Sequence, residues 1–218
     1  MSELWGVLTK YFPEFADGFL TTLRLVAVAF VIAMIVGTIV ASFRVAPARP
    51  LKVLGAIYVE YFRNIPLLIL LFIIFYGLPQ ELNIDEMVAG TVGLGLYTAA
   101  YVAETIRSGV FAVGKGQIEA ALSLGMSYGQ ALRKVVLPQA IRTVIPPLGS
   151  LTIAMIKNSA IVGGGLAVAD LLRTGRDIQN KNLQTNETFF WAAVGYLILT
   201  VTATIIVRRL ETRLTIKR

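Results

Sequence analysis

The chain has 218 residues and a net charge of +7, and 56% of its residues are hydrophobic while only 15% are charged. Soluble domains are about 45–50% apolar and about 25% charged, so this composition excludes a water-soluble enzyme. The absence of cysteine and histidine excludes disulfides, thiol nucleophiles, zinc clusters and histidine acid–base catalysis, and leaves only carboxylate chemistry open.

Long apolar segments follow one another along the chain. A membrane-crossing helix needs roughly 20 mainly apolar residues, and the stretches 25–43 and 188–207 meet this requirement without a single charge. Three further segments do so if each tolerates a polar residue near one end. We therefore predict five spans, near 20–43, 57–78, 87–108, 140–165 and 188–208. Because these segments are continuously apolar rather than alternating, the predicted fold is all-α, with residues 1–218 forming a single transmembrane domain.

The distribution of charge predicts how these spans are oriented. The stretches 44–63, 107–142 and 208–218 contain 14 of the 20 basic residues and three acids, whereas the other connections contain four basic residues and nine acids. Basic loops stay on the cytoplasmic side. We therefore expect the N-terminus outside and the C-terminus in the cytoplasm, as an odd number of spans requires.

The connection at about 115–138 has a helical pattern that is interrupted near its middle. Apolar and small residues recur every three or four positions from Ile118 to Val136, which indicates one helical face. Gly125 is suited to the position just after a helix. Ser127 and Gln130 have the spacing of a capping box that starts a second helix. Two short helices at an angle are predicted. The spacing alone is explained equally well by an amphipathic connector with no functional role.

This connection resembles the EAA loop of bacterial ABC-importer permeases. The matching positions are Glu119, Ala120, Ala121, Gly125, Leu137 and Pro138. Val135 stands where the family pattern has isoleucine. The resemblance implies that this loop forms coupling helices which contact an ATPase subunit, and that the six matching residues belong to this contact.

The flanking segments resemble the permeases that take up polar amino acids. Residues 100–109 read AYVAETIRSG, similar to the family block AYxAExxRxG, and residues 61–67 read YFRNIPL. A departure occurs at residues 157–160, which read KNSA where many members have KDTS. The resemblance covers residues from about 18 to the C-terminus.

This resemblance implies a type I importer fold in the bacterial cytoplasmic membrane. The expected partners are a second permease subunit, ABC ATPase subunits, an extracellular or periplasmic solute-binding protein and membrane lipid, with no nucleic acid. ATP and Mg would be bound by the ATPase, so no cofactor is expected in this chain and the chain itself is not an enzyme. The resemblance favours glutamine or glutamate as substrate.

Polar side chains within the predicted spans are candidates for the substrate pathway, because charged groups at membrane depth are costly. The candidates are Tyr97, Tyr101, Glu104, Lys157, Asn158 and Ser159. An amino acid is a zwitterion, so its carboxylate favours a cation such as Lys157 and its ammonium group favours a carboxylate such as Glu104. Equally, Glu104 is expected to form a structural pair with Arg107 or with Lys157.

Three local expectations concern ion pairing and proline. Glu60 and Arg63, three residues apart, are expected to form an ion pair. Pro146 and Pro147 are expected to kink the fourth span. Pro66 lies near the end of an element.

Two other functional classes are alternatives to the importer subunit. A small oligomeric channel or secondary transporter independent of ATP explains the spans and the buried charges, but gives no reason for a two-helix docking loop. A membrane enzyme would have to use carboxylates such as Glu60 or Glu104, and neither has a second acid nearby in the sequence.

Overall fold

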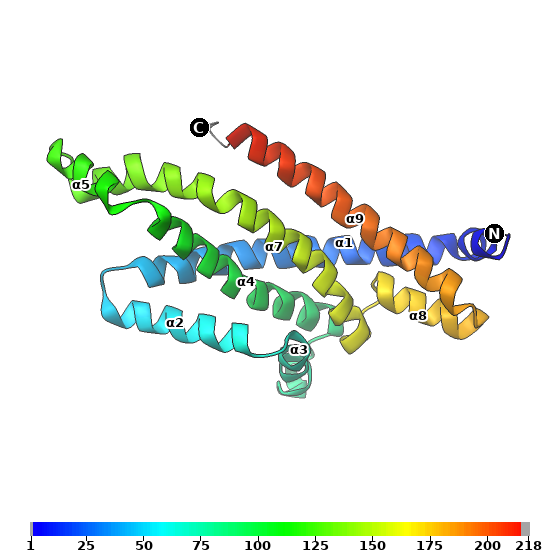
Figure 1. The fold of residues 1–218 in the computed structure, drawn as a ribbon. Helices are drawn as coiled ribbons and strands as arrows, with labels where there is room; N and C mark the ends of the chain where they lie inside the picture. Colours follow the sequence, from blue (N-terminus) through cyan, green and yellow to red (C-terminus); the bar gives the residue numbers. More distant parts are fainter. Residues whose placement is uncertain (1, 215–218) are drawn as a thin grey trace.

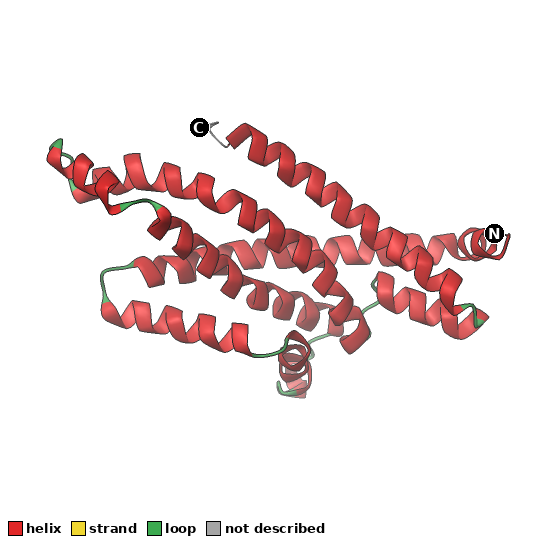
Figure 2. Ribbon diagram, in the orientation of Figure 1, coloured by secondary structure: helices red, strands yellow, loops and turns green. Residues whose placement is uncertain are grey.

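The computed structural model describes residues 2–214, and within them the chain is made of helices and connections without a strand (Figure 2). Residues 215–218, part of the basic C-terminal stretch 208–218, lie outside the described residues. The elements are α1 (Ser2–Val45), α2 (Arg49–Asn64), α3 (Leu67–Tyr76), the 3₁₀ turn η1 (Gln80–Leu82), α4 (Glu86–Ala112), α5 (Lys115–Ser123), α6 (Tyr128–Ala131), the π-helical turn η2 (Leu132–Val136), α7 (Leu137–Leu166), α8 (Leu171–Asn182) and α9 (Thr185–Leu214). The all-α prediction is confirmed.

Long helices form an elongated bundle whose two ends differ (Figure 1). The turn between α1 and α2, the short helix α5 and the end of α9 lie toward one end, and the N-terminus and α8 lie toward the other. The 44-residue helix α1 is about 66 Å long at 1.5 Å per residue, which exceeds the roughly 30 Å of hydrocarbon in a bilayer. Its first part is set off by a kink at Tyr11, where the backbone leaves helical geometry two residues before Pro13.

The second predicted span, 57–78, falls on two helices rather than on one. The chain breaks between α2 and α3, and the two helices meet at 104°. Pro66 is the cause, because its ring disfavours helical geometry in the preceding residue and its nitrogen has no hydrogen to donate. Ile65 is accordingly extended, with φ −95° and ψ 133°.

Three helices in the described residues are long and apolar enough to cross a membrane, or four if α2 and α3 count as one bent span. The five predicted spans exceed this number because α4, which holds the expected span 87–108, is not among these helices. At 27 residues α4 is about 40 Å long, which is sufficient for a crossing. Its composition reflects enclosure, since α1, α2, α3 and α7 all pack against it.

Glycine permits the close approach of α1 to α4. A Cβ atom on Gly37 would lie 2.6 Å from Val102 Cγ1 and 2.9 Å from the carbonyl oxygen of Ala99. On the opposite helix, a Cβ on Gly95 would lie 2.8 Å from Ile32 Cγ2. Small residues at a helix crossing bring backbones together and increase van der Waals contact, which drives helix association in membranes.

The helix α7 runs through Pro146 and Pro147 without a break, so these prolines do not divide the expected fourth span. At its start, α7 continues directly from α6 and η2. At its end, Ala167 adopts the left-handed conformation with φ 61°. Asp170 then precedes α8, and its buried side chain caps this helix by accepting a hydrogen bond from the Arg173 N–H at 2.9 Å.

Candidate functional site

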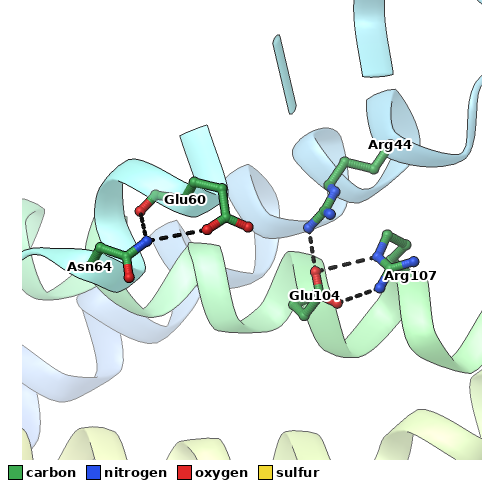
Figure 3. A network of polar contacts seen from close by, with 5 residues as sticks. All are labelled: Arg44, Glu60, Asn64, Glu104 and Arg107. Carbon is green, nitrogen blue, oxygen red and sulfur yellow. Dashed lines mark hydrogen bonds and ion pairs between the residues drawn. The ribbon is translucent and has the colours of Figure 1, made fainter. Parts of the chain in front are cut away.

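A charged cluster joins the end of α1 to the middle of α4 (Figure 3). The Glu104 carboxylate accepts hydrogen bonds from Arg107 Nη2 at 2.5 Å and Arg107 Nε at 3.3 Å, and it also pairs with Arg44 Nη1. The side chains of Arg44 and Glu104 are 15% and 24% exposed. The sequence analysis had two candidate partners for Glu104, Arg107 and Lys157, and the structure shows the pair with Arg107. No pattern in the sequence indicated that Arg44 contacts Glu104, because the two residues are 60 positions apart along the chain.

Aromatic side chains extend the polar face of α4 beyond this cluster. The hydroxyl oxygens of Tyr97 and Tyr101 are 3.0 Å apart, and the guanidinium of Arg63 lies over the Tyr101 ring, 5.5 Å from its centre. The ion pair expected between Glu60 and Arg63 is wrong. Instead, the Glu60 carboxylate accepts a hydrogen bond of 3.2 Å from the Asn64 amide, one turn further along α2 (Figure 3).

The three polar candidates on α7 point in different directions. Lys157 is exposed and forms no ion pair within residues 2–214, so it does not pair with Glu104. Asn158 is half-buried, whereas Ser159 is fully buried and its hydroxyl donates to the Ile156 carbonyl at 2.7 Å. Of the three, Lys157 has the side chain most accessible to a ligand.

An exposed polar stripe runs along α7 on the side of Lys157. Thr143, Ser150 and Lys157 are seven residues apart and are all exposed, and a spacing of seven keeps residues on one helical face. Sequence reasoning missed Thr143 and Ser150, although their spacing was visible. An exposed lysine in the second half of a membrane-crossing helix indicates that this face meets a polar passage or another protein rather than lipid.

A cavity of about 300 Å³ connects the polar faces of α4 and α7. Its lining includes Glu104, Thr105 and Ser108 from α4 and Thr143 and Pro147 from α7. Within residues 2–214 no group of three or more acidic side chains lies close enough together to hold a metal ion. The chemistry that this cavity offers is charge and hydrogen bonding.

The loop between α4 and α7 has the two-helix geometry that the sequence predicts. After α5, the Met126 N–H donates to the Ala121 carbonyl at 3.1 Å and the Gly125 N–H donates to the Leu122 carbonyl at 2.9 Å, the paired hydrogen bonds of a Schellman motif. Gly125 has φ +79°, a left-handed conformation that favours glycine. The predicted capping box is present, with Ser127 N–H donating to Gln130 Oε1 at 2.9 Å and Gln130 N–H donating to Ser127 Oγ at 3.3 Å.

One side of this loop is anchored to the bundle. Val113, Val136 and Ala140 form a small buried cluster, against which Ile118 and Leu132 pack. Ala121 also faces inward and is 4% exposed, whereas Glu119, Ala120, Leu137 and Pro138 are exposed.

The opposite side of the loop presents apolar side chains to its surroundings. Leu124 is 81% exposed and Tyr128 is 65% exposed, and Leu122 is also exposed. Sequence reasoning missed Leu124 and Tyr128, because neither apolar spacing nor the family pattern distinguishes outward from inward positions here. A group of exposed large apolar side chains marks a surface for another protein.

Comparisons with known proteins are consistent with this geometry. The family described as "Binding-protein-dependent transport system inner membrane component" matches residues 33–216. The chain is 42% identical to the probable glutamine ABC transporter permease protein GlnM of Bacillus subtilis, with 96% of this chain and 97% of GlnM covered. It is 34% identical to the glutamate transport system permease protein GluC of Corynebacterium glutamicum, with both chains covered completely.

A solved structure, that of an amino acid ABC transporter with histidines, has the same fold. The TM-score is 0.88 at 37% sequence identity, and the match covers 94% of this chain and 96% of the other. The likeness therefore extends to the arrangement of all the main helices.

The ion pairs of Glu104 with Arg44 and Arg107 are expected to stabilise the fold. Glu104→Gln removes the charge that compensates Arg44 and Arg107, so it should lower the free energy of unfolding by roughly 1–3 kcal/mol. The measurement is thermal unfolding of the purified protein in detergent. The control is Glu119→Gln, an exposed site where a change within about 0.5 kcal/mol is expected. Equal melting temperatures for the two variants would show that the cluster contributes nothing to stability.

Proposed function

The chain belongs to the family of binding-protein-dependent transport system inner membrane components, and from that premise we propose that it is the permease subunit of an ATP-driven importer for polar amino acids, with glutamine favoured. The relatives named for glutamine and glutamate support this choice. Two relatives that are each 34% identical are named for arginine and cystine, which extends the proposed substrates to the class of polar amino acids.

The proposed assembly contains two permease subunits, two ATPase subunits and a solute-binding protein outside the membrane. ATP and Mg bind to the ATPase subunits, and this chain contributes no catalytic residue. The second permease subunit is either a further copy of this chain or a related chain. It covers the exposed stripe of Thr143, Ser150 and Lys157 on α7, of which Thr143 also lines the cavity between α4 and α7.

The observation that carries this proposal is the exposed apolar surface of the coupling loop, defined as residues 115–138. Leu124 and Tyr128 stand out from the loop while Ile118 and Leu132 fix it to the bundle. A short helix pair with this exposure fits a groove on a partner protein. We assign the partner as the ATPase subunit, with Glu119, Ala120, Gly125, Leu137 and Pro138 in or beside the contact and Ala121 supporting it from within.

The proposed mechanism is alternating access. ATP binding closes the ATPase pair, and the coupling loops follow. Because α6, η2 and α7 are continuous, a displacement of the loop moves α7 and the polar stripe with it. The cavity then opens toward the solute-binding protein, and hydrolysis returns it to the cytoplasmic side.

The proposed solute pathway runs between the polar faces of α4 and α7. Lys157 binds the substrate carboxylate, because its ammonium group has no protein anion beside it within residues 2–214. Tyr97 and Tyr101 offer ring faces and hydroxyls to the substrate ammonium group. Asn158 and Ser159 belong to the same helical turn of α7 as Lys157 and stabilise it. Glu104 lines the cavity with its charge shared between Arg44 and Arg107.

The proposed orientation places the N-terminus outside and the C-terminus in the cytoplasm. The supporting observation is that the basic connections gather at one end of the bundle, where the α1–α2 turn and α5 lie (Figure 1). The end with α8 carries the more acidic connections.

The coupling loop is tested by two valine substitutions. Gly125→Val forces a β-branched residue into the left-handed region, which costs about 1–2 kcal/mol and should disrupt the Schellman turn. We expect about 5- to 30-fold less ATPase to co-purify, with weaker substrate-stimulated hydrolysis in vesicles. Gly6→Val is the matched control, because Gly6 has no positive φ, has open space around its Cβ position and lies in α1 outside the coupling loop. If both variants retain the ATPase like the unchanged chain, the coupling assignment fails.

The solute pathway is tested at Lys157. Lys157→Gln removes a charge-assisted hydrogen bond to the substrate carboxylate, worth roughly 1.5–3 kcal/mol, so glutamine binding should weaken about tenfold or more. The measurement is binding of labelled glutamine to the purified permease–ATPase complex without the solute-binding protein. Lys52→Gln, an exposed site on α2, should bind normally. Normal affinity in Lys157→Gln would remove Lys157 from the pathway.

The orientation is tested by labelling introduced cysteines, since the chain has none of its own. Asn182→Cys, at the end of α8, should react with an impermeant maleimide added to intact spheroplasts. Gln117→Cys, in α5, should react only after the membrane is opened. The reverse pattern would invert the proposed topology.

A further inference from the structure

An apolar groove lies between α1, α7 and α9, on a part of the molecule that the proposed pathway does not use. Its volume is about 320 Å³, at the lower end of the roughly 300–1,000 Å³ typical of ligand pockets. Phe30 of α1, Leu148 of α7 and Ile206 of α9 are among its lining residues. The groove is open outward, since Phe30 and Ile206 are both exposed.

The groove offers no free hydrogen-bond donor to a ligand. Thr152 is the one lining residue with a side-chain oxygen or nitrogen, and its hydroxyl already donates to the Leu148 carbonyl at 3.0 Å. The lining belongs to helices that cross the membrane. A ligand for this groove is therefore a hydrocarbon chain.

Two arginines lie beyond the same end of the groove. Arg142 precedes the lining residue Ile145 by three positions on α7, and Arg213 follows the lining residue Leu210 by three positions on α9. A spacing of three places each arginine on the groove side of its helix. Both are exposed, and neither forms an ion pair within residues 2–214. The last two turns of α9 hold three arginines against one acid, Glu211.

Charge complementarity distinguishes the possible occupants. A second copy of this chain would place its own basic end beside Arg142 and Arg213, because the stretches 44–63, 107–142 and 208–218 hold 14 of the 20 basic residues. Like charges in contact oppose such packing. A phosphate headgroup attached to an acyl chain satisfies both the arginines and the apolar groove.

We propose that this groove binds an anionic phospholipid, with an acyl chain between α1, α7 and α9 and the headgroup phosphate between Arg142 and Arg213. The site requires only that the chain spans a membrane, so it is independent of the substrate, the ATPase and the orientation. The lipid would hold α9 to α7 at the end where Figure 1 shows the two helices diverging.

The test is native mass spectrometry of the purified complex, titrated with phosphatidylglycerol or phosphatidylcholine. We expect one phosphatidylglycerol per copy of the chain, bound at least fivefold more tightly than phosphatidylcholine, since each arginine near a lipid headgroup favours it by about 1 kcal/mol. The double variant Arg142→Gln/Arg213→Gln should bind both lipids equally. The matched double variant Arg49→Gln/Lys52→Gln removes two exposed charges from the start of α2, which does not line the groove, and should keep the preference.

Filling the groove provides a second measurement that leaves both arginines in place. Ala203→Leu adds bulk to the lining and should weaken both lipids, with the melting temperature recorded to verify folding. Equal affinity of the unchanged protein for the two lipids would overturn the proposal, as would a preference that survives Arg142→Gln/Arg213→Gln. A change in permease–permease association with unchanged lipid binding in Ala203→Leu would assign the groove to a second copy and also overturn it.

Discussion

The close packing of α1 against α4 is the contact on which the other helices depend. Glycine at positions 37 and 95 leaves no room for a Cβ atom between the two helices, and much of the buried face of α4 consists of glycine and alanine. In a bilayer, apolar side chains gain little by leaving lipid, so helices associate chiefly through close van der Waals contact. With α1 in place on one side, α2, α3 and α7 cover the rest of α4.

Enclosure of α4 explains why polar side chains are tolerated at its centre. A carboxylate facing lipid would be costly, but Glu104 faces Arg44 and Arg107. Breaking such a partly buried pair is costly because it leaves an uncompensated charge. The last turn of α1 is thereby tied to the helix that lines the cavity, so packing and charge hold the same two helices together.

Local signals in the sequence predicted the coupling loop well, because its geometry depends on neighbouring residues. Gly125 supplies a left-handed turn, and Ser127 with Gln130 supplies a cap, whatever the rest of the chain does. The contact between Arg44 and Glu104 depends on helices meeting in space, and no spacing rule connects residues 60 positions apart. Proline disfavours helix in the residue before it, so the break at Pro66 could be predicted in principle, but the apolar residues that follow Pro66 favoured a single span.

The proposed coupling has a mechanical basis in the single helical run from Tyr128 to Leu166. Its first residues belong to the coupling loop, its middle lines the cavity, and its second half carries Lys157. Helices bend little under load compared with loops, so a force on Tyr128 reaches Lys157 without passing through a flexible connection. The turn that ends this run is fixed as well, because Asp170 accepts a hydrogen bond from the Tyr196 hydroxyl of α9 at 2.7 Å and the Leu171 N–H donates to Thr22 of α1 at 3.0 Å. These contacts resist movement of α7 at its far end, so in the proposed mechanism a displacement that starts at the loop tilts α7 about the Asp170 turn and changes the width of the cavity between α4 and α7.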